Sequence, residues 1–126
     1  MNVVALSQGK DLPRDLDVVG VVWTPEETDV DLYSRAAGRL WRVRFLDAGG
    51  HRVLDEGDLM EFWPQCSARN GTIFEVLSGG WFEQECKREG FLKRHTQPEM
   101  PEYFIGGQNA CVSVISHVPP ELVEVA

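Results

Sequence analysis

The chain has 126 residues, of which 43% are hydrophobic and 25% charged, and its formal net charge is -8. A chain of this length builds one hydrophobic core, so we treat residues 1–126 as a single domain. No stretch approaches the roughly 18 consecutive apolar residues of a membrane helix. The first residues lack the basic start and long apolar run of a secretory signal. These features predict a cytoplasmic protein with no membrane partner.

The charge is unevenly distributed along the chain. Residues 1–34 contain seven acidic and two basic side chains, residues 35–46 contain four arginines and no acid, and residues 47–63 contain five acids and one base. A net negative protein repels phosphate backbones, which disfavours nucleic acid as a partner. The same charge either keeps the protein soluble or attracts a basic protein partner.

The first half of the chain is rich in strand patterns. Residues 18–23 form a β-branched run that predicts a buried strand. The pattern of residues 3–6 does not decide whether they form an edge strand. Residues 25–37 allow two interpretations. Thr24 and Pro25 resemble a helix start, but the alternation of Asp29 and Asp31 with apolar residues is typical of a strand.

Residues 40–46 alternate cleanly, which predicts a half-buried antiparallel strand with the arginines on its outer face. Residues 47–50 supply a turn, and residues 51–54 are expected to return as a short partner of that strand. We expect Arg42 and Arg44 to pair with acids on a neighbouring strand. The alternative is that they bind an anionic ligand.

The second half predicts a helix beside a hairpin. Residues 58–63 fit one helical turn or a strand, and residues 72–77 predict a strand. Ser78 is expected to cap a helix that covers residues 82–89 and ends at Gly90. The runs 102–105 and 111–115 predict a hairpin. The hairpin ends at the prolines that precede an acidic tail.

Together these patterns predict an α+β fold, a single antiparallel sheet of about five or six strands packed by one or two helices. They do not indicate which face of the sheet is covered. The edge strand of such a sheet would allow a homodimer.

Cysteine and histidine spacing gives no indication of a metal site or a cofactor. Cys66, Cys86 and Cys111 lie 20 and 25 residues apart, without the close spacing that converging metal ligands show. Three scattered cysteines are also too few for a disulfide framework.

One alternative function uses a pocket between helix and sheet that contains Glu75, Cys111 or His117, as in a small enzyme or ligand-binding domain. Glu75 lies mid-strand between apolar residues, where burial would prepare a carboxylate for acid–base work. The simpler interpretation is that Glu75 is a solvated residue on the polar face of its strand. The same interpretation applies to Glu61 and Glu102.

Two segments resemble small acidic immunity proteins of bacterial polymorphic toxin systems. They are residues 78–82 (SGGWF) and residues 102–116, which read EYFI and, from residue 109, NACVSVIS. The resemblance implies a single cytosolic domain without catalytic residues that blocks the active site of a toxin. It assigns no functional residue.

The leading hypothesis is therefore a non-enzymatic protein-binding domain, an immunity protein that neutralises a basic toxin partner. The acidic residues between positions 55 and 61 are expected to supply the partner-binding surface. Its candidate residues are Asp55, Glu56, Asp58 and Glu61, with Trp63 as an aromatic anchor.

Overall fold

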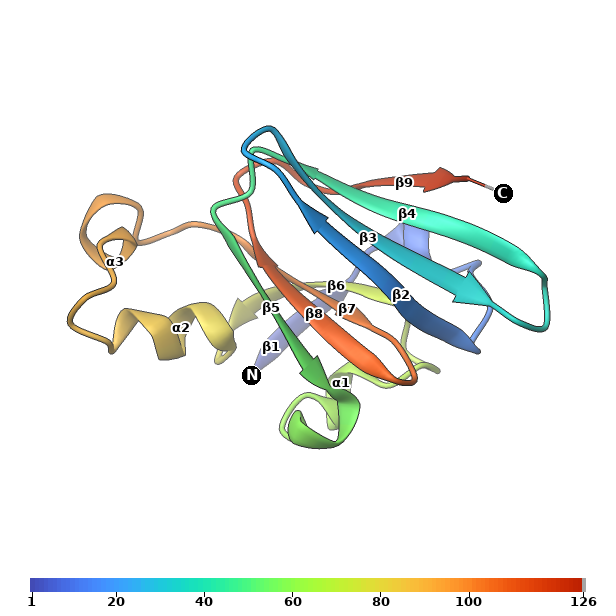
Figure 1. The fold of residues 1–126 in the computed structure, drawn as a ribbon. Helices are drawn as coiled ribbons and strands as arrows, with labels where there is room; N and C mark the ends of the chain where they lie inside the picture. Colours follow the sequence, from blue (N-terminus) through green and yellow to red (C-terminus); the bar gives the residue numbers. More distant parts are fainter. Residues whose placement is uncertain (126) are drawn as a thin grey trace.

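The computed structural model describes residues 1–125, in which nine strands form two antiparallel sheets. The sheets lie face to face as a β-sandwich (Figure 1). The five-stranded sheet has the order β1 (Asn2–Ala5), β6 (Ile73–Ser78), β7 (Glu102–Gly106), β8 (Ala110–Ile115) and β5 (Gly50–Asp55). The four-stranded sheet has the order β2 (Leu16–Trp23), β3 (Glu27–Ser34), β4 (Arg39–Leu46) and β9 (Glu121–Glu124).

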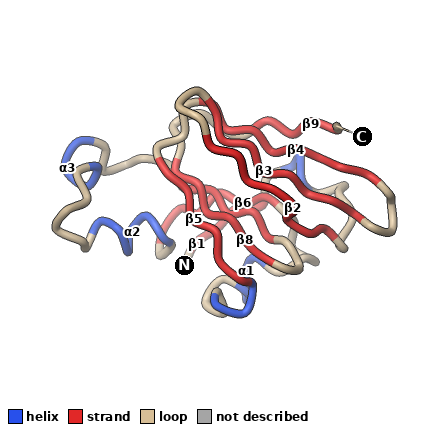
Figure 2. Tube along the Cα trace, viewed as in Figure 1, coloured by secondary structure: helices blue, strands red, loops and turns tan. Residues whose placement is uncertain are grey.

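The predicted α+β fold, with one sheet packed by one or two helices, is therefore wrong. Short helical segments lie at the periphery of the strands (Figure 2). Across residues 1–125 they are α1 (Trp63–Cys66), α2 (Trp81–Cys86), α3 (Lys93–Thr96) and the 3-10 turns η1 (Ser7–Gly9) and η2 (Glu56–Asp58). A second sheet takes the place of the expected helix as cover for the first. An apolar face of a sheet must be covered, but its sequence pattern does not specify whether a helix or a second sheet covers it.

The main core lies between the two sheets. The four-stranded sheet contributes Val30, Leu32, Val43 and Phe45, and the five-stranded sheet contributes Ile73, Tyr103, Ile105, Val112 and Val114. The rings of Phe45 and Tyr103 meet across the interface with centroids 5.6 Å apart. Alternate residues of each strand point into this layer, as period-two patterning requires.

The other face of the five-stranded sheet is covered by the chain between β5 and β6. Residues from this connection pack on β6, β7 and β8 in a second cluster, which comprises Leu59, Phe62, Cys66, Phe74, Val76, Phe104 and Cys111. Strands β7 and β8 are thus buried on both faces, which explains why they read as continuous apolar runs rather than as alternating ones.

Two further expectations from the first half of the chain are decided by strand pairing. Residues 25–37 contain a strand, β3, which pairs with β4 over its whole length. Residues 51–54 do form a strand, but their expected partner is wrong. The chain leaves the four-stranded sheet after β4, and β5 pairs with β8 in the other sheet, with Leu54 opposite Cys111.

The predicted helix over residues 82–89 is shorter than expected, because α2 ends at Cys86. Only Phe82 is buried on it, against Met100 and Ile115. Ser78 does not cap this helix. Its N-cap is Gly80, and the Glu102 carboxylate instead accepts hydrogen bonds from the backbone nitrogens of Trp81 (3.0 Å) and Phe82 (2.7 Å).

The β7–β8 hairpin also closes the corner between the two sheets. The side chain of Asn109 accepts a hydrogen bond from the Val18 nitrogen and donates one to the Val18 oxygen, both at 2.8 Å. The Gln108 nitrogen donates to the Leu16 oxygen at 2.8 Å. The first half of edge strand β2 is therefore bonded to the hairpin.

Candidate functional site

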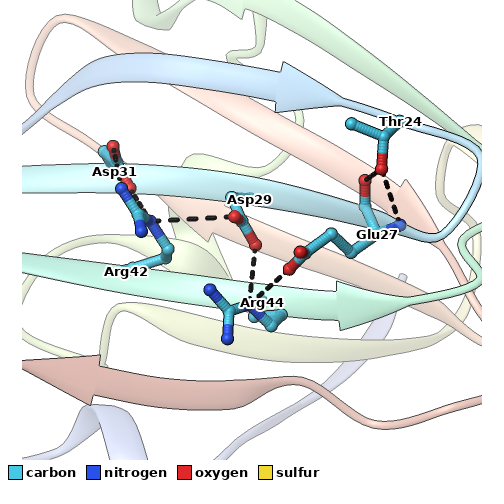
Figure 3. A network of polar contacts seen from close by, with 6 residues as sticks. All are labelled: Thr24, Glu27, Asp29, Asp31, Arg42 and Arg44. Atoms are coloured by element: carbon cyan, nitrogen blue, oxygen red, sulfur yellow. Dashed lines mark hydrogen bonds and ion pairs between the residues drawn. The ribbon is translucent and has the colours of Figure 1, made fainter.

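The outer face of the four-stranded sheet carries a row of paired charges on β3 and β4 (Figure 3). We call this row the charge ladder: Glu27, Asp29 and Asp31 with Arg42 and Arg44. Arg42 Nε lies 2.8 Å from Asp31 Oδ1, and Arg44 Nε lies 3.1 Å from Asp29 Oδ1. The pairing predicted for the two arginines is confirmed. Their guanidinium charges are neutralised within the ladder, so it offers no free anion site.

The acidic segment of the predicted partner site forms a different kind of surface. Residues 55–61, which we call the acidic ridge, run through η2 and the turn after it, beyond the end of β5 in Figure 1. Asp55, Asp58 and Glu61 are exposed and Glu56 is half-buried. Among residues 1–125, none of these four carboxylates forms an ion pair.

Two buried side chains hold the ridge in place. Leu59 is 2% exposed and Phe62 is fully buried, and the Phe62 ring stacks on Phe104 with centroids 4.5 Å apart and planes 9° from parallel. Leu59 and Phe62 close a turn in which the Phe62 nitrogen donates to the Leu59 oxygen at 2.9 Å, and the intervening Met60 and Glu61 are exposed. The exposure of the acids is thus set by packing.

The apolar residue that this arrangement presents is Met60, which is 75% exposed. The sequence predicts Trp63 as the anchor, but the structure places that side chain half-buried, with its Nε1 donating to the Glu56 oxygen at 3.0 Å. Met60 was missed. The spacing of Leu59 and Phe62 around it was the available signal.

The alternative pocket is assembled only in part: a hollow of about 360 Å³ between α2 and β6 is lined by Glu75, but by neither Cys111 nor His117. Glu75 faces the same side of its sheet as its partner Tyr103, toward the inter-sheet layer, whereas Cys111 lies on the opposite face with Phe104. His117 follows the far end of β8, is exposed, and contacts Gln97 Oε1 at 3.3 Å. Cys111 and His117 lie toward opposite ends of β8. Because each residue of a strand adds about 3.3 Å, the two side chains are far apart.

The buried cysteines are poor nucleophiles. Burial raises the pKa of Cys66 to about 12 and that of Cys111 to about 11. Only the thiolate attacks or binds a metal, and at neutral pH both side chains are thiols. They pack as small apolar groups in the second cluster.

Glu102 is buried rather than solvated, contrary to the expectation from its strand. It is 3% exposed, and burial raises its pKa, although the hydrogen bonds from Phe82 and Trp81 act in the opposite direction. Its two oxygens are both engaged by the start of α2. This carboxylate therefore fixes a helix and is not available to a substrate.

No family model, curated protein or solved structure matches this chain. Over residues 1–125, no three His, Cys, Asp or Glu side chains gather as metal ligands would. No helix in that range is both long enough and apolar enough to span a membrane.

Proposed function

We propose that this domain is a non-enzymatic binding protein that takes a basic protein partner on the acidic ridge. The observation that carries the proposal is the contrast in pairing. The acids of the charge ladder are bound to arginines, whereas Asp55, Asp58 and Glu61 are exposed and free of ion pairs within the described residues. The ridge gathers these exposed, unpaired acids within residues 55–61.

The two kinds of ridge residue would act at different stages of binding. Clustered negative charge attracts a basic partner over distances near the Debye length, about 8 Å at physiological salt, and so raises the association rate. Met60 lies among these charges with 75% of its surface exposed. Its burial against a partner would slow dissociation, since flexible thioether side chains fit irregular apolar surfaces.

The resemblance to immunity proteins makes a toxin the first class of partner to test. A toxin that cleaves or binds nucleic acid has a basic active site, which an acidic ridge would complement in charge. Inhibition by this means needs no catalytic group on the present chain. The product of the gene adjacent to this one is the natural first candidate.

The test is co-purification with matched charge variants. The native protein and the variants Asp58→Lys/Glu61→Lys and Glu89→Lys/Glu99→Lys are immobilised and exposed to lysate of the source cell. Each variant changes two exposed acids to lysine, so net charge changes equally. We expect a basic protein to be retained by the native domain and the control, and its association rate with the ridge variant to fall about tenfold or more.

Two outcomes would contradict the proposal. One is that the ridge variant and the control retain the partner equally well, which would place the interface elsewhere. The other is that the retained partner is acidic. A complementary measurement is Met60→Ala, which should raise the dissociation rate and leave the association rate unchanged.

A further inference from the structure

A second, oppositely charged feature lies near the ridge. Two loops, residues 9–14 and residues 68–72, enclose a hollow of about 260 Å³ whose lining includes Lys10, Arg14 and Arg69 and no acidic side chain. In a chain with 20 acids and 12 bases, a wall with three cations and no acid is an exception. We call it the cationic hollow.

Among the described residues, the side chains of these three cations have no ion-pair partner. In the chain through residue 125, ion pairs involve Arg39, Arg42, Arg44 and Arg88, and none involves a residue of the cationic hollow. All three side chains are exposed and line the same hollow. Because like charges repel, this arrangement becomes favourable when an anion lies between them.

The two loops are held in fixed proximity. Leu6 donates a backbone hydrogen bond to the Ile73 oxygen at 2.8 Å, and a Cβ atom on Gly9 would lie 3.2 Å from the Ile73 nitrogen. Thr72, only 6% exposed, lines the hollow as well. Backbone contacts therefore fix the floor of the hollow, and the exposed residues Lys10, Arg14 and Arg69 line it.

A second hollow of about 470 Å³ adjoins the first and shares Arg14 and Ala68 with it. Trp63, Gly106 and Gly107 line this neighbour. The hydrogen bond from Trp63 Nε1 to the Glu56 oxygen restrains the indole. A half-buried tryptophan beside two glycines is a place where a planar ring can stack.

We propose that the paired hollows form a binding site for a phosphate monoester of a planar, nucleoside-like molecule. The phosphate lies among Lys10, Arg14 and Arg69, where guanidinium groups donate charge-assisted hydrogen bonds. The planar group lies against Trp63. Glu56, which lines the second hollow only, repels the phosphate from that end and so fixes the orientation of the ligand.

The test titrates the full chain, labelled with nitrogen-15, with three probes: inorganic phosphate, adenosine and adenosine 5′-monophosphate. We expect phosphate to shift the amide signals of residues 69–72 alone. Adenosine 5′-monophosphate should shift these signals and those of residues 106–108, and bind about tenfold or more tightly than either part. The purified protein is used without any partner, so the result is independent of the proposed function of the ridge.

Charge-matched variants separate a site from general attraction. Arg69→Glu should weaken binding of inorganic phosphate and of the nucleotide about tenfold or more. Lys87→Glu changes the net charge equally at an exposed position that forms no ion pair among residues 1–125, and should leave both affinities unchanged. Trp63→Leu should weaken the nucleotide and leave inorganic phosphate unaffected.

Three results would overturn the proposal. The first is an absence of shifts at residues 69–72 with millimolar phosphate. The second is an equal loss of affinity in Arg69→Glu and Lys87→Glu, which would show only general attraction. The third is equal affinity for inorganic phosphate and adenosine 5′-monophosphate, which would show that the hollow beside Trp63 holds no planar group.

Discussion

The carboxylates of the charge ladder and those of the acidic ridge carry the same charge in opposite settings. Asp29 and Asp31 lie on a strand whose neighbour presents Arg42 and Arg44 in register, so that each acid meets a base. The ridge leaves the sheet after β5 and has no neighbouring strand to supply a counter-charge. Regular pairing neutralises charge, and a connection outside the sheet leaves it available to another molecule.

Removing the ring that holds the ridge should have the greatest consequence for stability. Phe62→Ala deletes a fully buried side chain stacked on Phe104. We expect a loss of about 3–5 kcal/mol in the free energy of unfolding, measured by urea denaturation. Met60→Ala, at a 75% exposed position in the same turn, should change it by less than about 0.5 kcal/mol. Similar losses in both variants would show that the turn is not anchored by Phe62.

A smaller effect distinguishes the ladder from the ridge directly. Arg42→Gln/Arg44→Gln leaves the ladder acids unpaired, and should lower the urea midpoint at low salt. The loss should shrink at high salt, because the Debye length falls from about 30 Å at 0.01 M to about 3 Å at 1 M. Asp58→Asn/Glu61→Gln removes charges that have no partner, and should not lower the midpoint at either salt concentration. A ridge variant as destabilised as the ladder variant would contradict the distinction.

The smallest expected effect concerns Glu102, a carboxylate that is neither salt-bridged like the ladder nor exposed like the ridge. Burial raises its pKa above the ordinary value of 4.5, so the folded protein holds this proton more tightly than the unfolded chain. The stability that the proton contributes is complete below pH 4.5 and is lost as the pH rises through the raised pKa.

Relative to Glu102→Gln, the native protein should therefore lose stability as the pH rises from 4.5 toward neutrality. Urea midpoints of both proteins across this range measure the change. Glu99→Gln removes an exposed acid nearby in sequence and serves as the control. Parallel midpoint curves for native protein and Glu102→Gln would show that Glu102 has no raised pKa.

The sequence predicts most strands of this fold and the β7–β8 hairpin, but not the pairing of strands far apart in the chain. Alternation in residues 40–46 identifies the strand, its buried face and the pairing of its arginines, because these depend on neighbouring positions along the chain. The partner of residues 51–54 depends on β8, more than fifty residues later, and proximity in sequence pointed to β4 instead. Without that pairing, the division into two sheets could not be predicted.

The candidate site shows the same limit. The acids of residues 55–61 are visible as composition, but their freedom from ion pairs depends on where the sheet ends. The strand pattern predicted a solvated Glu102, and it failed because α2 needs an acceptor for its first backbone nitrogens. The cationic hollow joins loops some sixty residues apart, so no local pattern in either loop indicates it.

The two hydrogen bonds between Asn109 and Val18 have a consequence for behaviour at high concentration. A primary amide offers the same donor and acceptor as a peptide group, so this side chain stands in for an additional strand at that point of β2. An incoming chain finds that position already occupied, which interrupts the template that fibril growth requires. Asn109 thus blocks this part of the β2 edge from pairing with a second chain.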